Sequence, residues 1–145
     1  MRISQYMTDK VITARATDGL RSTFFTMRRS EIRHMPVVDV DGSLIGLISD
    51  RDLRRPNWVD EAPDVTHIYN LDDDMRVGDV MTERVQVVHT YDSIHKAIKL
   101  FLEHKYGALP VLNKENQLVG ILSALDLLRA FDELMADYRE MKKRH

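Results

Sequence analysis

The sequence of 145 residues contains no cysteine, few aromatic residues (7%) and no excess of charge of either sign. The absence of cysteine excludes a disulfide scaffold, a thiolate zinc site and a cysteine nucleophile, and it fits a reducing compartment. The 21 basic residues are balanced by 23 acidic ones, which leaves a net charge of −2. The chain therefore lacks the overall basic field that would favour nucleic acid as its partner.

Long hydrophobic stretches are also missing. Apolar runs such as 108–112 and 118–122 are short, whereas a membrane span needs about 20 consecutive apolar residues. The first residues, from Met1 to Gln5, do not lead into the hydrophobic core of a signal peptide. We therefore expect a cytoplasmic protein without a membrane partner.

Common catalytic patterns are absent as well. The sequence has no phosphate-loop motif, no Gly-x-Gly-x-x-Gly and no Gly-x-Ser-x-Gly. None of the six histidines lies four residues from another, so no metal-binding pair is placed on one helix face. These absences predict a protein that is not an enzyme, requires no cofactor and binds no metal ion.

The sequence does contain an internal duplication. Identical residues recur at a constant offset of 74 positions, as Met7 and Met81 do. Other identical pairs are Thr8 with Thr82, Pro36 with Pro110, Gly46 with Gly120, Ser49 with Ser123, and Asp52 with Asp126. An offset that stays constant without a gap indicates two copies of one structural unit.

The duplication predicts how the chain is divided. We expect a first copy over 1–58, a linker over 59–74, a second copy over 75–132 and a C-terminal helical extension over 133–145. Each copy has the pattern β-α-β-β-α, with short β-branched stretches around one helical stretch. One copy alone is too small to bury a sufficient core. The prediction is therefore an α+β fold in which the two copies pack sheet against sheet about a pseudo-twofold axis.

Two helical stretches carry apolar stripes. The stripe in the second copy consists of Ile94, Ala97, Ile98, Phe101 and Leu102. The stripe of the C-terminal helix consists of Leu127, Leu128, Phe131, Leu134, Met135, Tyr138 and Met141. Asp18 and Asp92 precede the first helical stretch of each copy and are predicted N-caps. Because the C-terminal stripe needs burial, we expect a homodimer.

A Gly-x-x-Ser-x-x-Asp motif ends a predicted buried strand in each copy. It consists of Gly46, Ser49 and Asp52 in the first copy, and of Gly120, Ser123 and Asp126 in the second. The glycine permits close backbone approach, and a serine at a helix start can cap the helix, where backbone N–H groups attract anions. A carboxylate can accept hydrogen bonds from a ribose diol. The motif is compatible both with simple helix capping and with a nucleotide site.

These residues together resemble the tandem cystathionine-β-synthase (CBS) domain pair, or Bateman module. The matching stretches are Met-Thr at 7–8 and 81–82, 36–39, 46–53, 106–111 and 120–127. The resemblance implies a regulatory module that senses an adenine nucleotide (AMP, ADP or ATP) and signals to an unidentified effector protein. Alternatives are a ligand-free scaffold, a module for S-adenosylmethionine or NAD, and a nucleic-acid binder that uses the arginine-rich first copy.

The resemblance also implies which residues bind the ligand. In the family each cleft draws on both copies, with the motif serine and aspartate of one copy facing strand residues of the other. Carried over, one cleft combines Ser49, Arg51 and Asp52 with 85–87, including Val87, and with Ala108. The other combines Ser123 and Asp126 with Val11, Ile12, Thr13, Arg33, His34, Met35 and Pro36.

Overall fold

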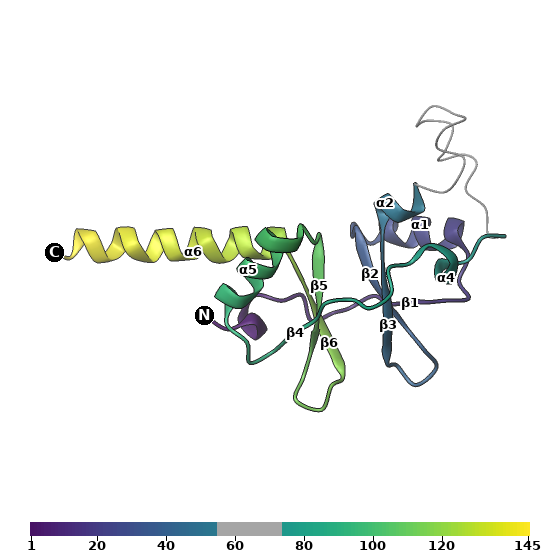
Figure 1. Ribbon diagram of the computed structural model, residues 1–145. Coiled ribbons are helices and arrows are strands. Elements are labelled where there is room, and N and C mark those ends of the chain that lie inside the picture. The colour runs from purple at the N-terminus through teal and green to yellow at the C-terminus, as the bar shows by residue number, and fades with distance from the viewer. Residues whose placement is uncertain (55–73) are drawn as a thin grey trace. The chain divides into compact units, whose positions relative to one another are not determined.

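The computed structural model describes residues 1–54 and 74–145, and the chain divides into two compact units (Figure 1). Unit 1 comprises Met1–Lys10 and Gln86–His145, and unit 2 comprises Val11–Val85. Each unit holds a three-stranded sheet with helices, which confirms the predicted α+β class. The predicted linker over 59–74 lies outside the described residues except for Asp74.

Unit 2 is built on a mixed sheet with the strand order β1-β2-β3. Its elements are β1 (Ala14–Arg15), α1 (Leu20–Arg29), β2 (His34–Val38), β3 (Leu44–Ser49), α2 (Asp50–Leu53) and α4 (Val77–Val80). β1 is parallel to β2, and β3 is antiparallel to β2. Gly42, with φ of +83°, occupies the left-handed position that the turn between β2 and β3 requires.

Unit 1 repeats this topology with the order β4-β5-β6. Its elements are the 3₁₀ helix η1 (Ile3–Gln5), β4 (Val88–His89), α5 (Ile94–His104), β5 (Ala108–Leu112), β6 (Leu118–Ser123) and α6 (Ala124–Lys143). The register repeats as well, since Val37 faces Gly46 in one sheet and Val111 faces Gly120 in the other. The predicted order β-α-β-β-α is therefore confirmed in both copies.

The first strand of each copy has only two residues, and a proline explains why. β1 pairs with β2 only at Val37 and Val38, beyond Pro36. Because proline has no N–H to donate, it is tolerated in a strand only where one edge stays open. Pro110 has the same position in β5, and β4 begins only at Val88.

The first residues of each copy, here called its opening segment (3–8 in the first copy and 77–82 in the second), pack with the sheet of the other copy. Ile3 lies in the core of unit 1, and Thr8 forms a backbone bridge to Ile121 of β6. In the same way Val77 lies in the core of unit 2, and Thr82 bridges to Leu47 of β3. Each unit thus combines the sheet of one copy with the first residues of the other.

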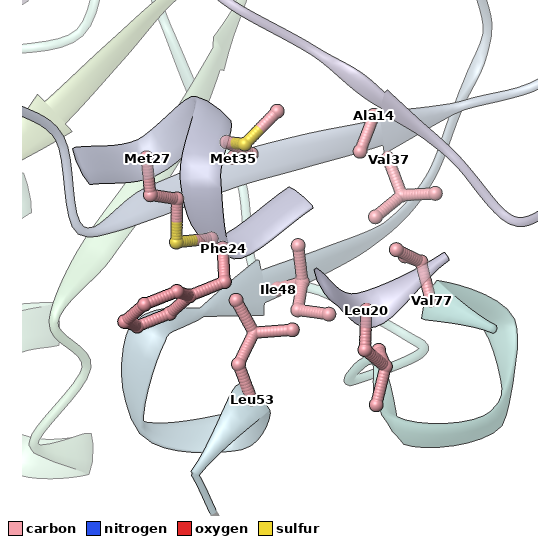
Figure 2. Close-up of a cluster of buried hydrophobic side chains, with 9 residues drawn as sticks. All are labelled: Ala14, Leu20, Phe24, Met27, Met35, Val37, Ile48, Leu53 and Val77. Carbon is pink, nitrogen blue, oxygen red and sulfur yellow. The ribbon is translucent and has the colours of Figure 1, made fainter. Parts of the chain in front are cut away.

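Buried apolar side chains hold each unit together. Figure 2 shows the core of unit 2, in which side chains from the sheet, α1, α2 and α4 meet. These side chains are Ala14, Leu20, Phe24, Met27, Met35, Val37, Ile48, Leu53 and Val77. In unit 1 the stripe of α5 is buried only in part, because Ile94 and Ala97 are buried while Leu102 is 76% exposed. Unit 1 therefore covers only part of the predicted apolar stripe.

The N-caps of α1 and α5 lie one residue after the predicted caps, Asp18 and Asp92. Their N-caps are Gly19 and Ser93. Asp18 and Asp92 instead accept hydrogen bonds from the backbone N–H groups of Arg15 (2.9 Å) and His89 (2.8 Å), and so fix the turn that follows each first strand. Burial opposes ionisation of Asp92, but the His89 N–H and Lys96 outweigh it and lower its pKa.

Helix α6 is the longest described helix, and its second half extends beyond the rest of unit 1 (Figure 1). Every residue from 131 to 145 is exposed. Over residues 1–54 and 74–145, no helix combines the length and apolar character that crossing a membrane requires.

Candidate functional site

The Ser-x-x-Asp motif forms a reciprocal capping box at the start of a helix in each unit. In unit 2, Ser49 Oγ accepts a hydrogen bond from the Asp52 N–H (3.1 Å), and Asp52 Oδ2 accepts one from the Ser49 N–H (2.9 Å). In unit 1 the Ser123 N–H donates to Asp126 Oδ2 (2.8 Å), and the Asp126 N–H donates to Ser123 Oγ (3.3 Å). The capping that the motif predicts is thus present in both copies.

The capping box occupies one carboxylate oxygen and leaves the other for a further donor. No donor among the described residues reaches Asp52 Oδ1. Asp126 Oδ1 lies 3.4 Å from the guanidinium of Arg129, a side chain that is largely exposed. The position that matches Arg129 in the first copy is Arg55, which lies outside the described residues. A carboxylate held in this way is oriented before any ligand arrives.

The residue two before each strand proline pairs with the motif serine of the same sheet. His34 faces Ser49 across β2 and β3, and Ala108 faces Ser123 across β5 and β6. The Asp50 N–H donates to the Arg33 carbonyl oxygen (2.9 Å), which ties the start of α2 to the residue before β2. The structure therefore brings Arg33, His34, Ser49 and Asp52 together within unit 2.

Burial and nearby charges act on His34. Burial lowers the pKa of its imidazole, the carboxylates of Asp50 and Asp52 oppose this shift, and Arg33 adds to it. The net result is a pKa below the usual value of 6.5. His34 is therefore held as neutral imidazole at neutral pH, a form that can both donate and accept hydrogen bonds.

We expect protonation of His34 to destabilise the folded protein. Because the folded-state pKa lies below the unfolded-state value, the unfolded state binds more protons between the two values. Stability is therefore complete above a pH of about 6.5 and declines as the pH falls toward the folded-state pKa. Urea denaturation at pH 7.5 and 5.5 should show a smaller pH effect in His34→Gln than in the wild type. An NMR titration that places the His34 pKa at or above 6.5 would contradict this assignment.

Arginine side chains surround an open cavity of about 310 Å³ at the end of α1. The residues that line it are Phe24, Met27, Arg28, Glu31, Ile32, Arg33, Asp50 and Arg54. Of these only Arg33 is a predicted site residue; the concentration of arginine in the first copy is the signal that points to Arg28 and Arg54. Arg54 lies 4.0 Å from Asp50, and Arg28 lies over the Phe24 ring. Arg51 is exposed on α2.

The other predicted site residues lie at the strand starts. Ile12 and Thr13 are exposed, and Val11 and Val87 are half-buried. Met35, Pro36 and Ala108 are buried, and Met35 belongs to the core of unit 2. These three positions can therefore present chiefly backbone groups to a ligand.

Both implied clefts join residues of different units. Ser49, Arg51 and Asp52 lie in unit 2, whereas Val87 and Ala108 lie in unit 1. Ser123 and Asp126 lie in unit 1, whereas 11–13 and 33–36 lie in unit 2. The combination across copies stays a prediction.

The motif glycines serve packing within each unit. A Cβ on Gly46 would lie 2.6 Å from Met81 Sδ and 3.0 Å from the Thr82 carbonyl oxygen. A Cβ on Gly120 would lie 2.5 Å from Met7 Sδ and 3.2 Å from the Thr8 carbonyl oxygen. The space beside each glycine is filled by the opening segment of the other copy.

The described residues contain no group of three or more His, Asp or Glu side chains placed to hold a metal ion. What remains in each unit is an oriented carboxylate at a helix start. In unit 2 the neutral imidazole belongs to His34, which faces the motif serine across two strands, and arginines line the cavity at the end of α1. This set can accept hydrogen bonds from hydroxyl groups and attract an anion, but no nucleophile with an adjacent general base is evident in it.

Comparison with known families gives a match over most of the chain. A family model described as the CBS domain matches residues 3–56 and 77–133. The protein MJ1225 of Methanocaldococcus jannaschii is 26% identical over 152 residues, which cover 95% of this chain and 53% of that protein. Its crystal structure superposes with a TM-score of 0.75 at 25% identity, over 90% of this chain and 49% of the other. This chain thus spans about half the length of MJ1225.

A second relative is CBSX2, a chloroplastic CBS-domain protein of Arabidopsis thaliana. It is 30% identical over 118 residues, which cover 69% of this chain and 50% of that protein. Its crystal structure has a TM-score of 0.80 at 24% identity and covers 93% of this chain and 96% of the other. A structure of CBSX2 in complex with AMP has a TM-score of 0.75 at 24% identity, over 92% and 98% of the two chains.

The CBS domain pair of the protein MJ0100 shares the fold at lower identity. Its crystal structure contains 5′-methylthioadenosine and S-adenosyl-L-methionine. The TM-score is 0.75 at 19% identity, and the match covers 92% of this chain and 97% of the other.

Proposed function

Because this chain belongs to the CBS-domain family, we propose that it is a regulatory module that binds an adenine nucleotide, AMP or ATP, and signals to a partner protein. The observation that carries the proposal is the capping box, present twice, which orients Asp52 and Asp126 at helix starts. Binding of AMP by CBSX2 supports the choice of ligand class.

The carboxylates are suited to the ribose of such a ligand. A ribose diol offers two hydroxyl donors, and an ionised carboxylate is an acceptor that can take both. Hydrogen bonds to a charged acceptor contribute about 1.5–3 kcal/mol. We assign Asp52 and Asp126 to ribose recognition, with their orientation set by Ser49 and Ser123.

The arginine side chains of unit 2 are suited to the phosphate. Arg33 immediately precedes His34, which faces the motif serine. A guanidinium can form two parallel hydrogen bonds to phosphate oxygens. We assign Arg51 to the phosphate of a ligand bound at Asp52. We assign Arg33 to the phosphate of a ligand bound at Asp126, and His34 to a polar contact with that second ligand.

In this proposal the module transmits a signal and catalyses no reaction. A ligand shifts a conformational equilibrium only when it binds one arrangement of the protein better than another. The nucleotide must therefore favour one conformation of the chain, and the effector protein must recognise that conformation.

A second ligand is S-adenosylmethionine, which the structure of MJ0100 favours because it contains that molecule. It carries the same ribose diol but has no phosphate. Arg33→Ala should therefore weaken AMP binding more than S-adenosylmethionine binding if the ligand of this chain is a nucleotide.

A thermal-shift panel tests the proposed function. We expect AMP or ATP to raise the Tm by several degrees, since a ligand at about 100 times its Kd stabilises a protein by about 2.7 kcal/mol. The panel should include ADP, S-adenosylmethionine, NAD and cyclic dinucleotides, with GMP as the control for the base.

The other results of the panel separate the alternatives. If S-adenosylmethionine alone raised the Tm, that molecule and not a nucleotide would be the ligand of this chain. No shift with any compound would contradict ligand binding and favour an interaction scaffold. Salt-dependent binding of RNA or DNA without any nucleotide shift would indicate a nucleic-acid binder.

A further inference from the structure

Helix α6 carries a row of large apolar side chains that its own unit leaves exposed. Beyond the first turns these side chains are Phe131, Leu134, Met135, Tyr138 and Met141, which are between 38% and 62% exposed. Every residue of α6 from 131 onward is exposed, and the second half of the helix extends beyond the rest of unit 1 (Figure 1). An exposed apolar row of this length indicates a surface that a partner covers.

The row has the spacing of a coiled-coil seam. Leu127, Phe131, Leu134, Tyr138 and Met141 follow one another at alternating intervals of four and three residues, as positions d and a of a heptad do. Leu127 packs against the core of unit 1. The seam therefore begins inside the unit and continues along the free part of the helix.

A side-chain contact fixes which side of α6 faces its own unit. The Tyr6 hydroxyl donates a hydrogen bond to Glu133 Oε2 (2.9 Å). Glu133 occupies heptad position c, outside the seam. The contact thus holds the helix against the opening segment of the chain while the seam stays exposed.

We propose that the seam of α6 pairs with the same seam of a second copy of this chain, as a parallel two-stranded coiled coil. In this arrangement Phe131 packs on Phe131 and Leu134 on Leu134 of the second copy. The proposal concerns assembly and does not depend on the ligand.

The charges beside the seam favour the parallel direction. Asp137 occupies position g and Lys142 the following position e. In a parallel pair these positions face each other between the two chains, so two attractive ion pairs form. In an antiparallel pair with Leu134 opposite Tyr138, the two copies of Asp137 would face each other, and like charges repel.

The same charges argue against a lipid surface as the occupant. Away from the seam, α6 is acidic up to residue 141. Its charged residues there are Asp126, Arg129, Asp132, Glu133, Asp137, Arg139 and Glu140. Helices that lie on anionic membranes carry lysine and arginine on their polar face. A second copy of the chain is the occupant that fits both the apolar seam and its flanking charges.

Sedimentation of the full-length chain and two variants tests the pairing. We expect a wild-type dimer at micromolar concentration. Leu134→Glu, which puts a charge in the seam, should give a folded monomer. Ala136→Glu adds the same charge on the opposite side of α6 and should remain a dimer. Circular dichroism shows whether each variant is folded. A monomeric wild type, or a dimer that Leu134→Glu leaves intact, would overturn the proposal.

Engineered cysteines test the direction, because the natural chain has no cysteine. In the parallel pair Tyr138→Cys should form a covalent dimer with itself on oxidation. A mixture of Tyr138→Cys and Leu134→Cys chains that instead cross-links only between the two variants would contradict the parallel direction. A dimer that shows neither cross-link would exclude the seam as its interface.

Discussion

Truncation of Ile3 to alanine should destabilise unit 1 by about 2–5 kcal/mol, the usual cost of replacing a fully buried isoleucine. Ile3 is 0% exposed and packs with Val88, Leu109 and Leu122 of the second copy, although it belongs to the first copy by sequence. The cost is large because the side chain is fully buried, so its truncation removes apolar contacts and leaves a cavity in the core.

The matched variant is Val77→Ala. Val77 is equivalent to Ile3 in the second copy and is also 0% exposed, but it packs in the core of unit 2 with Ala14, Leu20 and Ile48. We expect Val77→Ala to destabilise unit 2, by less than the loss for Ile3→Ala because the valine side chain is smaller.

Hydrogen exchange by mass spectrometry separates the two effects. Ile3→Ala should speed exchange in β5 and β6 more than in β2 and β3, and Val77→Ala should do the reverse, since local unfolding follows the core that is weakened. Faster exchange of β2 and β3 in Ile3→Ala would show that each copy packs only with itself.

The duplication could be predicted from the sequence. That the opening segment of each copy packs with the sheet of the other copy could not. Met7-Thr8 and Met81-Thr82 are identical, and so are their partners Gly46 and Gly120. Either segment is therefore compatible with either sheet as far as local sequence is concerned. The choice depends on contacts between residues far apart in the chain, such as the bridge between Thr8 and Ile121.

The candidate site was predictable where it depends on local chemistry. Ser-x-x-Asp at the end of a buried strand is a capping pattern, and both boxes form as predicted. The pairing of His34 with Ser49 follows from the register between β2 and β3. Pro36 in β2 and the turn at Gly42 set this register together. The Tyr6–Glu133 contact joins the two ends of the chain, and no local pattern indicates it.

Replacement of both motif aspartates should have the largest effect on function. We expect Asp52→Asn with Asp126→Asn to weaken nucleotide binding by about tenfold or more, since a hydrogen bond to a charged acceptor contributes about 1.5–3 kcal/mol and 1.4 kcal/mol is a tenfold change in Kd. Asparagine keeps the size and the oxygen that accepts the serine N–H, so the capping box can persist.

Asp79→Asn is the matched control. Asp79 forms the aspartate half of such a box at α4, where its Oδ2 accepts a hydrogen bond from the Arg76 N–H (3.0 Å). It lies outside the proposed site, so its replacement should change stability slightly and leave nucleotide affinity unchanged. An equal loss of affinity in Asp79→Asn would mean that the motif aspartates act through stability alone.

Titration calorimetry with AMP and 2′,3′-dideoxy-AMP tests ribose recognition most directly, because the two ligands differ only in the hydroxyl groups that Asp52 and Asp126 are proposed to bind. The wild type should bind AMP about tenfold more tightly or better, and the doubly substituted protein should bind both ligands with the same weak affinity. Equal affinity of the wild type for the two ligands would contradict the assignment.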